Sequence, residues 1–401
     1  MKYLYIKNKR QIISKKNDTN LRYTKLTFIL GLAGFISAAD NWFISPSLPA
    51  IADGFHVPIS KAGIILTAYM IPYGIMQPVY GFLSDMCSKA KVLRWIVCGL
   101  AVGTAGCALS SSLSILLIWR VIAGFFAAGI IAVSLALIGD TMPNCERQVY
   151  VGKFMGIVFL GQGLSSGLGG ALTKYFSWRT AFVFFTGAAI CTVFFLYKLP
   201  NDSPISAQHR FFSQAKEVIF TNKGRIVFPS ALLAGFLLLG LYSYLGAFIH
   251  DVIGLDYFQV GIIIMFYGFA CVIAGSQVGK LVKRVGQKKV ILIGGCLALC
   301  SSLLLMFFSC WQAVWISTVS LGFGYIFIQS TLATIAFDIV SESRGISSGL
   351  IGLCLFSGGG LGTAFSGCLL SQATYRTLWT VMTFGIISFV LIVGKLKFDK
   401  I

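Results

Sequence analysis

Acidic residues and histidine are scarce in this sequence. Its 401 residues contain 13 Asp or Glu and three His, and His56, His209 and His250 all lie outside the long apolar runs. No phosphate-binding loop, paired metal ligands or other catalytic motif is present, which argues against an enzyme and against an ATP-driven pump. We therefore expect no metal and no cofactor.

Charge of either sign is also sparse. Charged residues make up 11% of the chain and hydrophobic residues 57%, and the mean hydropathy is +0.84. Such a composition excludes a soluble globular protein and predicts a polytopic membrane protein. Eleven Cys are present. Most of them lie inside apolar runs at no ligand-like spacing, so we interpret them as small core residues.

The net charge of +19 comes from basic residues that are dispersed among short loops rather than gathered on one helix face. This distribution argues against nucleic-acid binding and indicates topology, because cytoplasmic loops of membrane proteins are enriched in Lys and Arg. Residues 1–25 carry eight Lys or Arg and one acid. No obvious cleavage site follows them, so we expect a retained basic cytoplasmic arm.

Hydropathy predicts an all-α protein with twelve transmembrane helices, since a helix needs about 20 apolar residues to cross the hydrocarbon core. If both termini are cytoplasmic, all but five of the 32 Lys and Arg lie on the cytoplasmic side, and of those five only Arg120 lies within a span. The expected spans are residues 26–49, 62–84, 92–110, 114–138, 151–173, 180–198, 226–249, 259–279, 290–309, 312–337, 346–370 and 378–396.

A hydrophilic interval at residues 199–225 separates the sixth span from the seventh, and loops on its two sides repeat each other. Trp178-Arg179-Thr180, for example, is mirrored by Tyr375-Arg376-Thr377. Matched loops at a nearly constant separation indicate duplication of a six-helix half. We therefore expect one six-helix bundle at residues 26–198, a cytoplasmic linker, and a second bundle at residues 226–401.

The loop after the second span runs from Gly81 through Asp85 to Lys89 and Lys91, and a similar Gly followed by a basic cluster returns at residues 279–291. This loop resembles the signature between the second and third helices of major facilitator superfamily transporters, although two positions after Asp85 differ from it. The resemblance implies two pseudo-symmetric six-helix bundles around a central cavity and alternating access by rocking. It also implies that Gly81, Asp85, Lys89 and Lys91 form a conformational gating loop.

Asp40 and Arg120 are the only charged residues well inside the expected spans. Ionisable side chains in hydrocarbon are costly and commonly functional, and the helical rise places these two at similar depth. Two interpretations stay open. In one, the pair only joins two helices. In the other, Asp40 gains and loses a proton during transport, with Arg120 favouring the carboxylate when it is close. The sequence around Arg120 also resembles the family's fourth-helix motif, whose Arg is associated with proton coupling.

Span five carries a helix-packing motif of small residues, which allows another helix backbone to approach closely. The motif resembles the fifth-helix signature of drug/proton antiporters in the bacterial twelve-helix branch of the family, with two Ser in place of Gly-Pro. Its members are Gly161, Ser165, Ser166, Gly169 and Gly170.

Polar and aromatic residues near proline bends are candidates for a substrate cavity, because bent helices present polar groups to the interior and aromatic walls suit large lipophilic substrates. For each aromatic, packing against lipid or protein is the plainer interpretation. The candidates are Asn41, Trp42, Tyr69, Tyr73, Gln77, Tyr242, Tyr244, Tyr267 and Gln329.

These observations predict a secondary transporter, driven by a proton gradient, that exports lipophilic or amphipathic small molecules. A selective carrier of one metabolite, importer or exporter, is the alternative, and a non-transporting membrane receptor on the same scaffold is a third. We expect the lipid bilayer, a small-molecule substrate and protons as partners, and no nucleic acid. We also expect a monomer in the cytoplasmic membrane of a bacterium.

Overall fold

The computed structural model describes the backbone of residues 2–199, 211–337 and 344–395, with side chains from residue 21 onward except those of residues 85, 144–146, 148, 211–214, 337, 344–346 and 348. Within these residues the chain forms helices and no strands. The helices are α1 (Lys2–Trp42), α2 (Ile44–Gly54), α3 (Ile59–Ala62), α4 (Ile64–Met86), α5 (Lys89–Ala108), α6 (Leu113–Thr141), α7 (Asn144–Tyr175), α8 (Trp178–Leu196), α9 (Phe211–Phe220), α10 (Gly224–Ser243), α11 (Leu245–Asp251), α12 (Tyr257–Val285), α13 (Gln287–Phe307), α14 (Trp311–Phe337), α15 (Arg344–Leu370) and α16 (Tyr375–Lys395).

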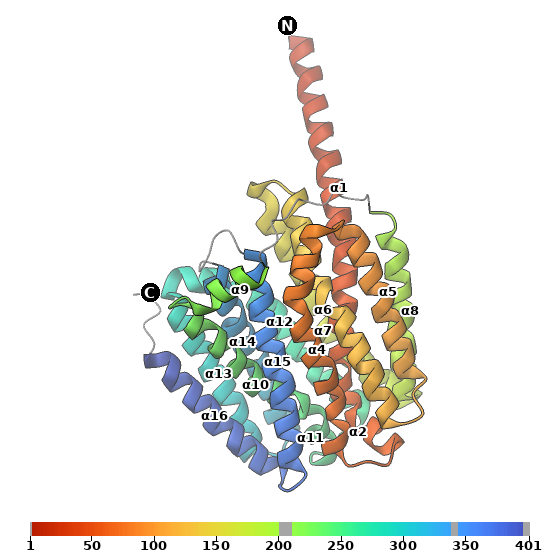
Figure 1. The fold of residues 1–401 in the computed structure, drawn as a ribbon, viewed down its shortest axis with the longest axis vertical. Helices are drawn as coiled ribbons and strands as arrows, with labels where there is room; N and C mark the ends of the chain where they lie inside the picture. Colours follow the sequence, from red (N-terminus) through yellow and green to blue (C-terminus); the bar gives the residue numbers. More distant parts are fainter. Residues whose placement is uncertain (1, 200–210, 338–343, 396–401) are drawn as a thin grey trace.

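Eleven helical segments of the described chain are long and apolar enough to cross a membrane, and the bent pair α1–α2 makes a twelfth if it counts as one span. This agrees with the twelve spans expected from hydropathy. The short helix α9 in the interval before α10 was not expected from the sequence. Its buried Ala215 and Val218 give it an apolar side, and it packs against α10 and α15. The first helix extends well beyond the bundle toward the N-terminus (Figure 1).

The first and seventh spans are broken rather than continuous. The first bends by 45° at Phe43, between α1 and α2. Pro46 accounts for this break, because it has no N–H to bond to the carbonyl of Trp42 four residues earlier. The seventh span breaks at Tyr244, between α10 and α11. Both breaks lie at one end of the molecule (Figure 1), which we call the broken-helix end. The opposite end, with residues 87–88 and 286, is the basic-loop end.

The helices form two halves, α1–α8 and α10–α16, that meet mainly along two helix pairs, α4 with α15 and α7 with α12. Small residues allow this contact. On α4 and α15, the carbonyl of Gly360 accepts a hydrogen bond from the Thr67 hydroxyl at 3.0 Å. A Cβ added at Gly163 of α7 would lie 2.9 Å from the backbone of Met265 on α12. Side chains larger than hydrogen would therefore force these halves apart.

The α7–α12 contact loosens toward the basic-loop end. Glycines recur every seven residues on the two facing surfaces, so successive glycines mark successive levels of the interface. A Cβ at Gly170 or Gly163 would meet α12 backbone, whereas a Cβ at Gly156 would meet open space. The two helices thus touch through their backbones at the broken-helix end and in the middle, whereas at the other end α12 meets a side chain of α7, since a Cβ at Gly275 would lie 3.3 Å from the Phe159 ring. The two rows are Gly156, Gly163 and Gly170 on α7, and Gly261, Gly268 and Gly275 on α12.

Candidate functional site

A buried ion pair joins α1 to α6 in the first half. Nη1 of Arg120 lies 2.9 Å from Oδ2 of Asp40, and both side chains are completely buried. The hydroxyl of Thr104, on α5, donates to the other carboxylate oxygen of Asp40 at 2.7 Å. Three helices therefore meet at one carboxylate whose two oxygens each have a donor, which is the arrangement that makes a buried charge tolerable.

Arg120 also has neutral acceptors. It donates from Nη1 to the backbone oxygen of Asp40 at 3.0 Å, from Nε to that of Ile65 at 3.4 Å, and from Nη2 to Oδ1 of Asn41 at 3.4 Å. The centre of its guanidinium lies 4.2 Å from the centroid of the Tyr69 ring, within the range of a cation–π contact. The cation thus keeps hydrogen-bond partners whether or not the carboxylate is charged.

Sequence reasoning placed Asp40 and Arg120 at one depth, and the structure brings them into contact. It did not identify Thr104, because a Thr within an apolar run usually bonds its own helix. The Thr104 hydroxyl also lies 2.9 Å from the Leu100 carbonyl oxygen of its own helix, so its single proton has two acceptors within reach. The available signal was the pair of glycines around it, Gly103 and Gly106, which let α5 lie close to α6.

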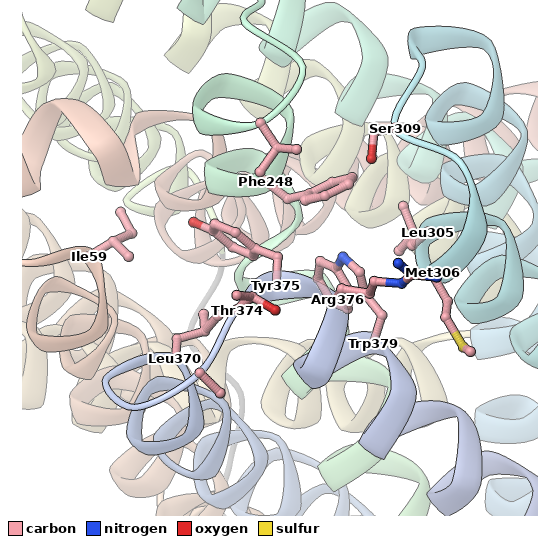
Figure 2. A pocket seen from close by; sticks show the side chains of 12 residues that line it. Ile59, Phe248, Leu305, Met306, Ser309, Leu370, Thr374, Tyr375, Arg376 and Trp379 are labelled. Carbon is pink, nitrogen blue, oxygen red and sulfur yellow. The ribbon is translucent and has the colours of Figure 1, made fainter.

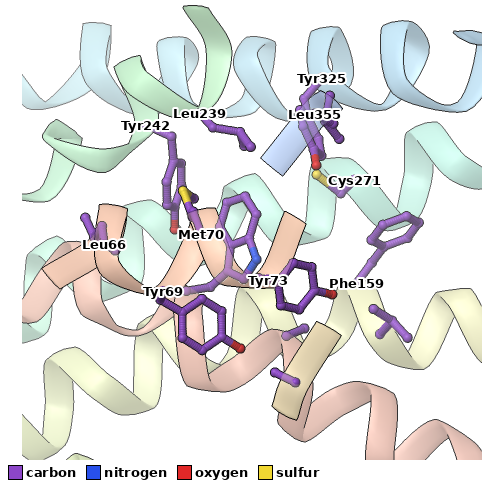
Figure 3. Close-up of a cluster of buried hydrophobic side chains, with 14 of the residues drawn as sticks. Leu66, Tyr69, Met70, Tyr73, Phe159, Leu239, Tyr242, Cys271, Tyr325 and Leu355 are labelled. Carbon is purple, nitrogen blue, oxygen red and sulfur yellow. The ribbon is translucent and has the colours of Figure 1, made fainter. Parts of the chain in front are cut away.

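An aromatic cluster spans the two halves. Trp42, at the end of α1, packs against three tyrosines of the second half, with ring centroids 4.4 Å from Tyr242, 5.0 Å from Tyr267 and 6.3 Å from Tyr325. All four side chains are buried. Figure 3 shows Tyr242 and Tyr325 on the side of the second half, with Tyr73 near them. Three members were expected from the sequence, whereas Tyr325 was missed because nothing distinguishes it from other tyrosines in apolar runs.

The remaining cavity candidates divide into groups. Tyr73 contacts the second half, with its ring centroid 4.5 Å from that of Phe356, and Gln77 lies against Gly352 of α15. Gln329 has a buried Oε1 without a hydrogen-bond partner in the described part of the chain. Asn41 and Tyr69, by contrast, contact Arg120, so the structure places these two with the ion pair rather than in a cavity wall.

Tyr244 lies at the broken-helix end rather than in the middle of the molecule. It is the residue at which α10 and α11 meet, and its ring is fully buried. Its hydroxyl lies over Gly63 of the first half and over Gly367 of α15, where a Cβ would collide with it. Tyr244 therefore packs across the boundary of the halves, against a third interruption of the helices, the one at Gly63 between α3 and α4.

The two broken spans contact each other directly. The hydroxyl of Ser45, at the start of α2, lies 3.2 Å from the carbonyl oxygen of Tyr242 and accepts a hydrogen bond from the backbone N–H of Gly246 at 3.3 Å. A Cβ at Gly246 would lie 2.1 Å from the carbonyl oxygen of Ser45. Only glycine allows this approach, so the broken-helix end is closed by backbone contact between α2 and α11.

An exposed ion pair adds to this closure. Nζ of Lys174, at the end of α7, lies 2.7 Å from Oδ2 of Asp256, the residue that caps α12. The hydrogen bond from Lys174 lowers the pKa of the Asp256 carboxyl from its ordinary value of 3.8, and backbone N–H groups at the start of α12 lower that pKa further. Neither residue was singled out from the sequence, because both lie in short loops whose pairing depends on the fold.

The expected gating loop lies at the basic-loop end. Lys89, at the start of α5, is buried and its Nζ lies 2.9 Å from Oδ2 of Asp140 at the end of α6. Lys91 is exposed, while its backbone N–H donates to the Ser88 hydroxyl that caps α5. Gly81 lies within α4, and the side chain of Asp85 lies outside the described residues. The gating role of the loop stays a prediction. Asp140 was missed because it lies two residues beyond the expected end of its span.

The small residues of α7 face two different helices. A Cβ at Gly161 would collide with α1, one at Gly169 with Phe43 at the break between α1 and α2, and one at Gly170 with α12. The hydroxyl of Ser166 lies 3.2 Å from the carbonyl oxygen of Trp42, while that of Ser165 bonds its own helix. The motif thus packs α7 between its own half and the other half.

Comparison with known proteins identifies relatives that match most of the chain. The family model described as Major Facilitator Superfamily matches residues 30–363. The chain is 25% identical over 355 residues to the MFS-type transporter YceJ of Bacillus subtilis, covering 84% of this chain and 86% of that protein. It is 24% identical over 360 residues to the efflux pump aflT of Aspergillus parasiticus, covering 89% of this chain and 65% of that protein.

A shorter match is to the multidrug resistance protein fnx1 of Schizosaccharomyces pombe, 29% identical over 174 residues. It covers 43% of this chain, and the chain spans 33% of the length of fnx1. Among solved structures, a variant of the nucleoside transporter NupG superposes with a TM-score of 0.80 at 13% identity, covering 92% of this chain and 99% of that one. This likeness shows the shared fold.

Proposed function

The chain belongs to the Major Facilitator Superfamily of secondary transporters, and we propose that it exports lipophilic or amphipathic small molecules in exchange for protons by alternating access. One observation carries the proposal. Three consecutive residues at the break of the first span, Asp40, Asn41 and Trp42, connect the buried ion pair to the aromatic cluster between the halves. The relatives named as a multidrug resistance protein and an efflux pump support export.

The aromatic cluster is the proposed wall of the substrate site. Its members come from α1, α10, α12 and α14, so the wall exists only when the two halves are together in this region. Flat apolar rings accept many lipophilic shapes, and the helix stretches that carry the three tyrosines, residues 226–243, 257–279 and 311–337, contain no charged residue. A substrate that inserts between Trp42 and the tyrosines would move the end of α1.

The proton step follows from the surroundings of Asp40. When its carboxylate takes up a proton, the ion pair between α1 and α6 is lost, while Arg120 keeps the backbone oxygens of Asp40 and Ile65 and the side chain of Asn41 as acceptors. The end of α1, already broken at Phe43, is then held to α6 by hydrogen bonds to neutral acceptors alone and tilts more easily. Substrate at Trp42 and a proton at Asp40 would thus act on the same three residues in alternation.

The proposed sidedness places the basic-loop end in the cytoplasm, because Lys and Arg gather on that side. The described conformation then has its outer end closed by the Ser45, Tyr242 and Gly246 contacts. Its contact between α7 and α12 is looser at the proposed cytoplasmic end, where it runs through the Phe159 side chain instead of backbone. Lipophilic compounds would enter from the cytoplasmic side, and rocking of the halves would release them outside.

Proton release on substrate binding tests this function. Purified full-length protein in weakly buffered solution is titrated with lipophilic dyes such as ethidium and rhodamine, and the pH of the solution is followed. We expect the native protein to release protons on binding, and Asp40→Asn to bind dye without release, because the amide cannot take up a proton.

Asp53→Asn is the matched control. Asp53 is exposed and lies outside the ion pair, so that variant should release protons as the native protein does. If Asp40→Asn still drives uphill dye transport on a pH gradient, Asp40 only joins helices and the proton coupling proposed here is wrong. If no lipophilic dye binds or moves while one metabolite does, the chain is a selective carrier.

A further inference from the structure

A cavity of about 420 Å³ lies in the second half at the broken-helix end, away from the aromatic cluster. It is bounded by α11, the end of α13 and the start of α16, with Ile59 of the first half at its edge (Figure 2). Its volume is in the range of small-ligand sites. The apolar part of its wall comprises Phe248, Val252, Leu305, Met306 and Leu370.

Two hydrogen-bond donors line this cavity, the buried Trp379 and the exposed Arg376, and the buried one lacks an acceptor. The side chain of Trp379 is completely buried, and its indole Nε1 has no hydrogen-bond partner in the described part of the chain. Arg376, one helical turn earlier, lines the cavity and forms no ion pair with the described residues. Figure 2 shows the indole beside Arg376, below Phe248. A buried N–H without an acceptor is unfavourable, so an acceptor atom in the cavity would stabilise it.

The equivalent place in the first half is filled. Arg179 there donates from Nη2 to the carbonyl oxygen of Ser110 at 2.9 Å. Its guanidinium lies 4.1 Å from the centroid of the Trp178 ring, and Phe55, at the end of α2, packs on the same tryptophan at 5.3 Å. The basic side chain is therefore used within the fold, and an aromatic ring occupies the space next to it.

The duplication shows what changed in the second half. Val252 stands 197 residues after Phe55, and at the same separation Arg376 follows Arg179 and Trp379 follows Phe182. A smaller residue thus replaces the filling ring, and an indole with an N–H replaces a phenyl ring. Ser309 lies on the second-half loop that corresponds to the loop of Ser110, and it lines the cavity. Arg376 makes no hydrogen bond to Ser309, unlike Arg179 to Ser110. The second half thus keeps the arginine, gains the indole N–H of Trp379 as a donor, and has a cavity where the first half has the Phe55 ring.

We infer that this cavity binds an anionic phospholipid. Its phosphate would be held by the Arg376 guanidinium and the Trp379 N–H, and one acyl chain would lie against Leu305, Met306 and neighbouring apolar residues. A lipid fits better than a soluble anion, because the lining residues Met306 and Ser309 flank Phe307 and Phe308 in the chain, two apolar side chains that are 59% and 54% exposed at the end of a membrane-spanning helix. The inference concerns a site apart from the aromatic cluster and does not depend on the proposed export function.

Native mass spectrometry of the purified full chain tests the site. Delipidated protein is titrated with phosphatidylglycerol or with phosphatidylcholine, whose headgroup has no net charge. We expect one phosphatidylglycerol to bind at least tenfold more tightly than phosphatidylcholine, and Arg376→Gln to lower its affinity about tenfold through loss of a charged hydrogen bond. Arg179→Gln, the counterpart in the filled half, is the matched control and should bind lipid as the native protein does. Equal affinity of native protein and Arg376→Gln would overturn the inference.

A second variant tests the space in the cavity separately from the charge of Arg376. Val252→Phe copies the filling residue of the first half and keeps Arg376, so it should lower lipid affinity as strongly as Arg376→Gln while leaving the thermal unfolding temperature unchanged or higher. Inorganic phosphate and octanoate serve as soluble competitors that test the source of the anion. If either displaces the lipid at an equal concentration, the ligand is a soluble anion and the lipid inference is wrong. If Val252→Phe binds lipid normally, the cavity is not the site.

Discussion

The two halves of this transporter share one helix plan, yet only the first has an ion pair in the core of its described part. In that half Asp40, Arg120 and Thr104 join three helices. In the second half the corresponding helices α13 and α14 are joined by a hydrogen bond of 2.7 Å between the hydroxyls of Ser301 and Ser317. Helix packing in this fold therefore does not need buried charge, which makes the ion pair a poor candidate for a purely structural element.

The broken-helix end shows a second difference between equivalent places. Of the two helix pairs that join the halves, α7–α12 has the Lys174–Asp256 ion pair at this end. At the corresponding ends of α15 and α4 the chain has Ser371 and Pro58, which cannot form one. The duplicated plan is thus symmetric in its backbone and asymmetric in its polar chemistry, and each asymmetry can be removed by mutation.

The largest effect is expected at the ion pair. Arg120→Ala leaves the Asp40 carboxylate buried without a counter-charge, and we expect it to destabilise the protein by about 3–5 kcal/mol. Thr318→Ala, 198 residues later on α14, is the matched change in the second half, and since among the described residues Thr318 bonds only its own helix it should cost about 1 kcal/mol or less. Thermal unfolding in detergent measures both.

The double variant Asp40→Asn with Arg120→Gln extends this comparison. Removing both charges at once should recover most of the stability lost in Arg120→Ala, because no unpaired charge is left in the core. Uphill transport should be absent in the double variant, as we expect for Asp40→Asn alone. If the double variant still transports against a gradient, the ion pair affects only the packing of the first half, and Asp40 has no role in coupling.

The sequence predicted the fold well because hydropathy and loop charge are properties of single segments. It predicted twelve spans and the similar depth of Asp40 and Arg120. It did not predict Thr104, Tyr325 or the break at Tyr244, since these depend on which helix lies next to which. A hydroxyl or phenol in an apolar run has the same local signature whether it bonds its own helix or another one. Only the packed structure distinguishes the two cases.

Gly246→Val should have the next largest effect, because its side chain would collide with the Ser45 carbonyl. We expect it to prevent closure of the broken-helix end and to shift the population toward the open form by more than tenfold. Ser45→Ala is the equivalent change on the first-half side of this contact and removes only a hydrogen bond, so its shift should be below tenfold. Spin labels at residues 53 and 257 report the separation. Gly187→Val, in open space, is the control, and an unchanged distance distribution in Gly246→Val would contradict closure by backbone contact.

The smallest effect is expected at the Lys174–Asp256 ion pair, which is present at one of the two helix pairs only. Both side chains are more than a third exposed, so water and salt screen their interaction, and Lys174→Gln should shift the closed population by about fivefold at most. Because the pair lowers the pKa of Asp256, its contribution to closure is complete above the ordinary carboxyl pKa of 3.8 and is lost only as the pH falls below that lowered pKa. The contribution of this pair to the same spin-label distances should therefore be constant between about pH 5 and 8. If the native protein opens with pH in that range, the two variants show which pair responds. An opening that persists in Lys174→Gln but disappears in Asp40→Asn would assign the pH response to the buried Asp40–Arg120 pair. An opening that is lost in Lys174→Gln would assign it to the exposed Lys174–Asp256 pair.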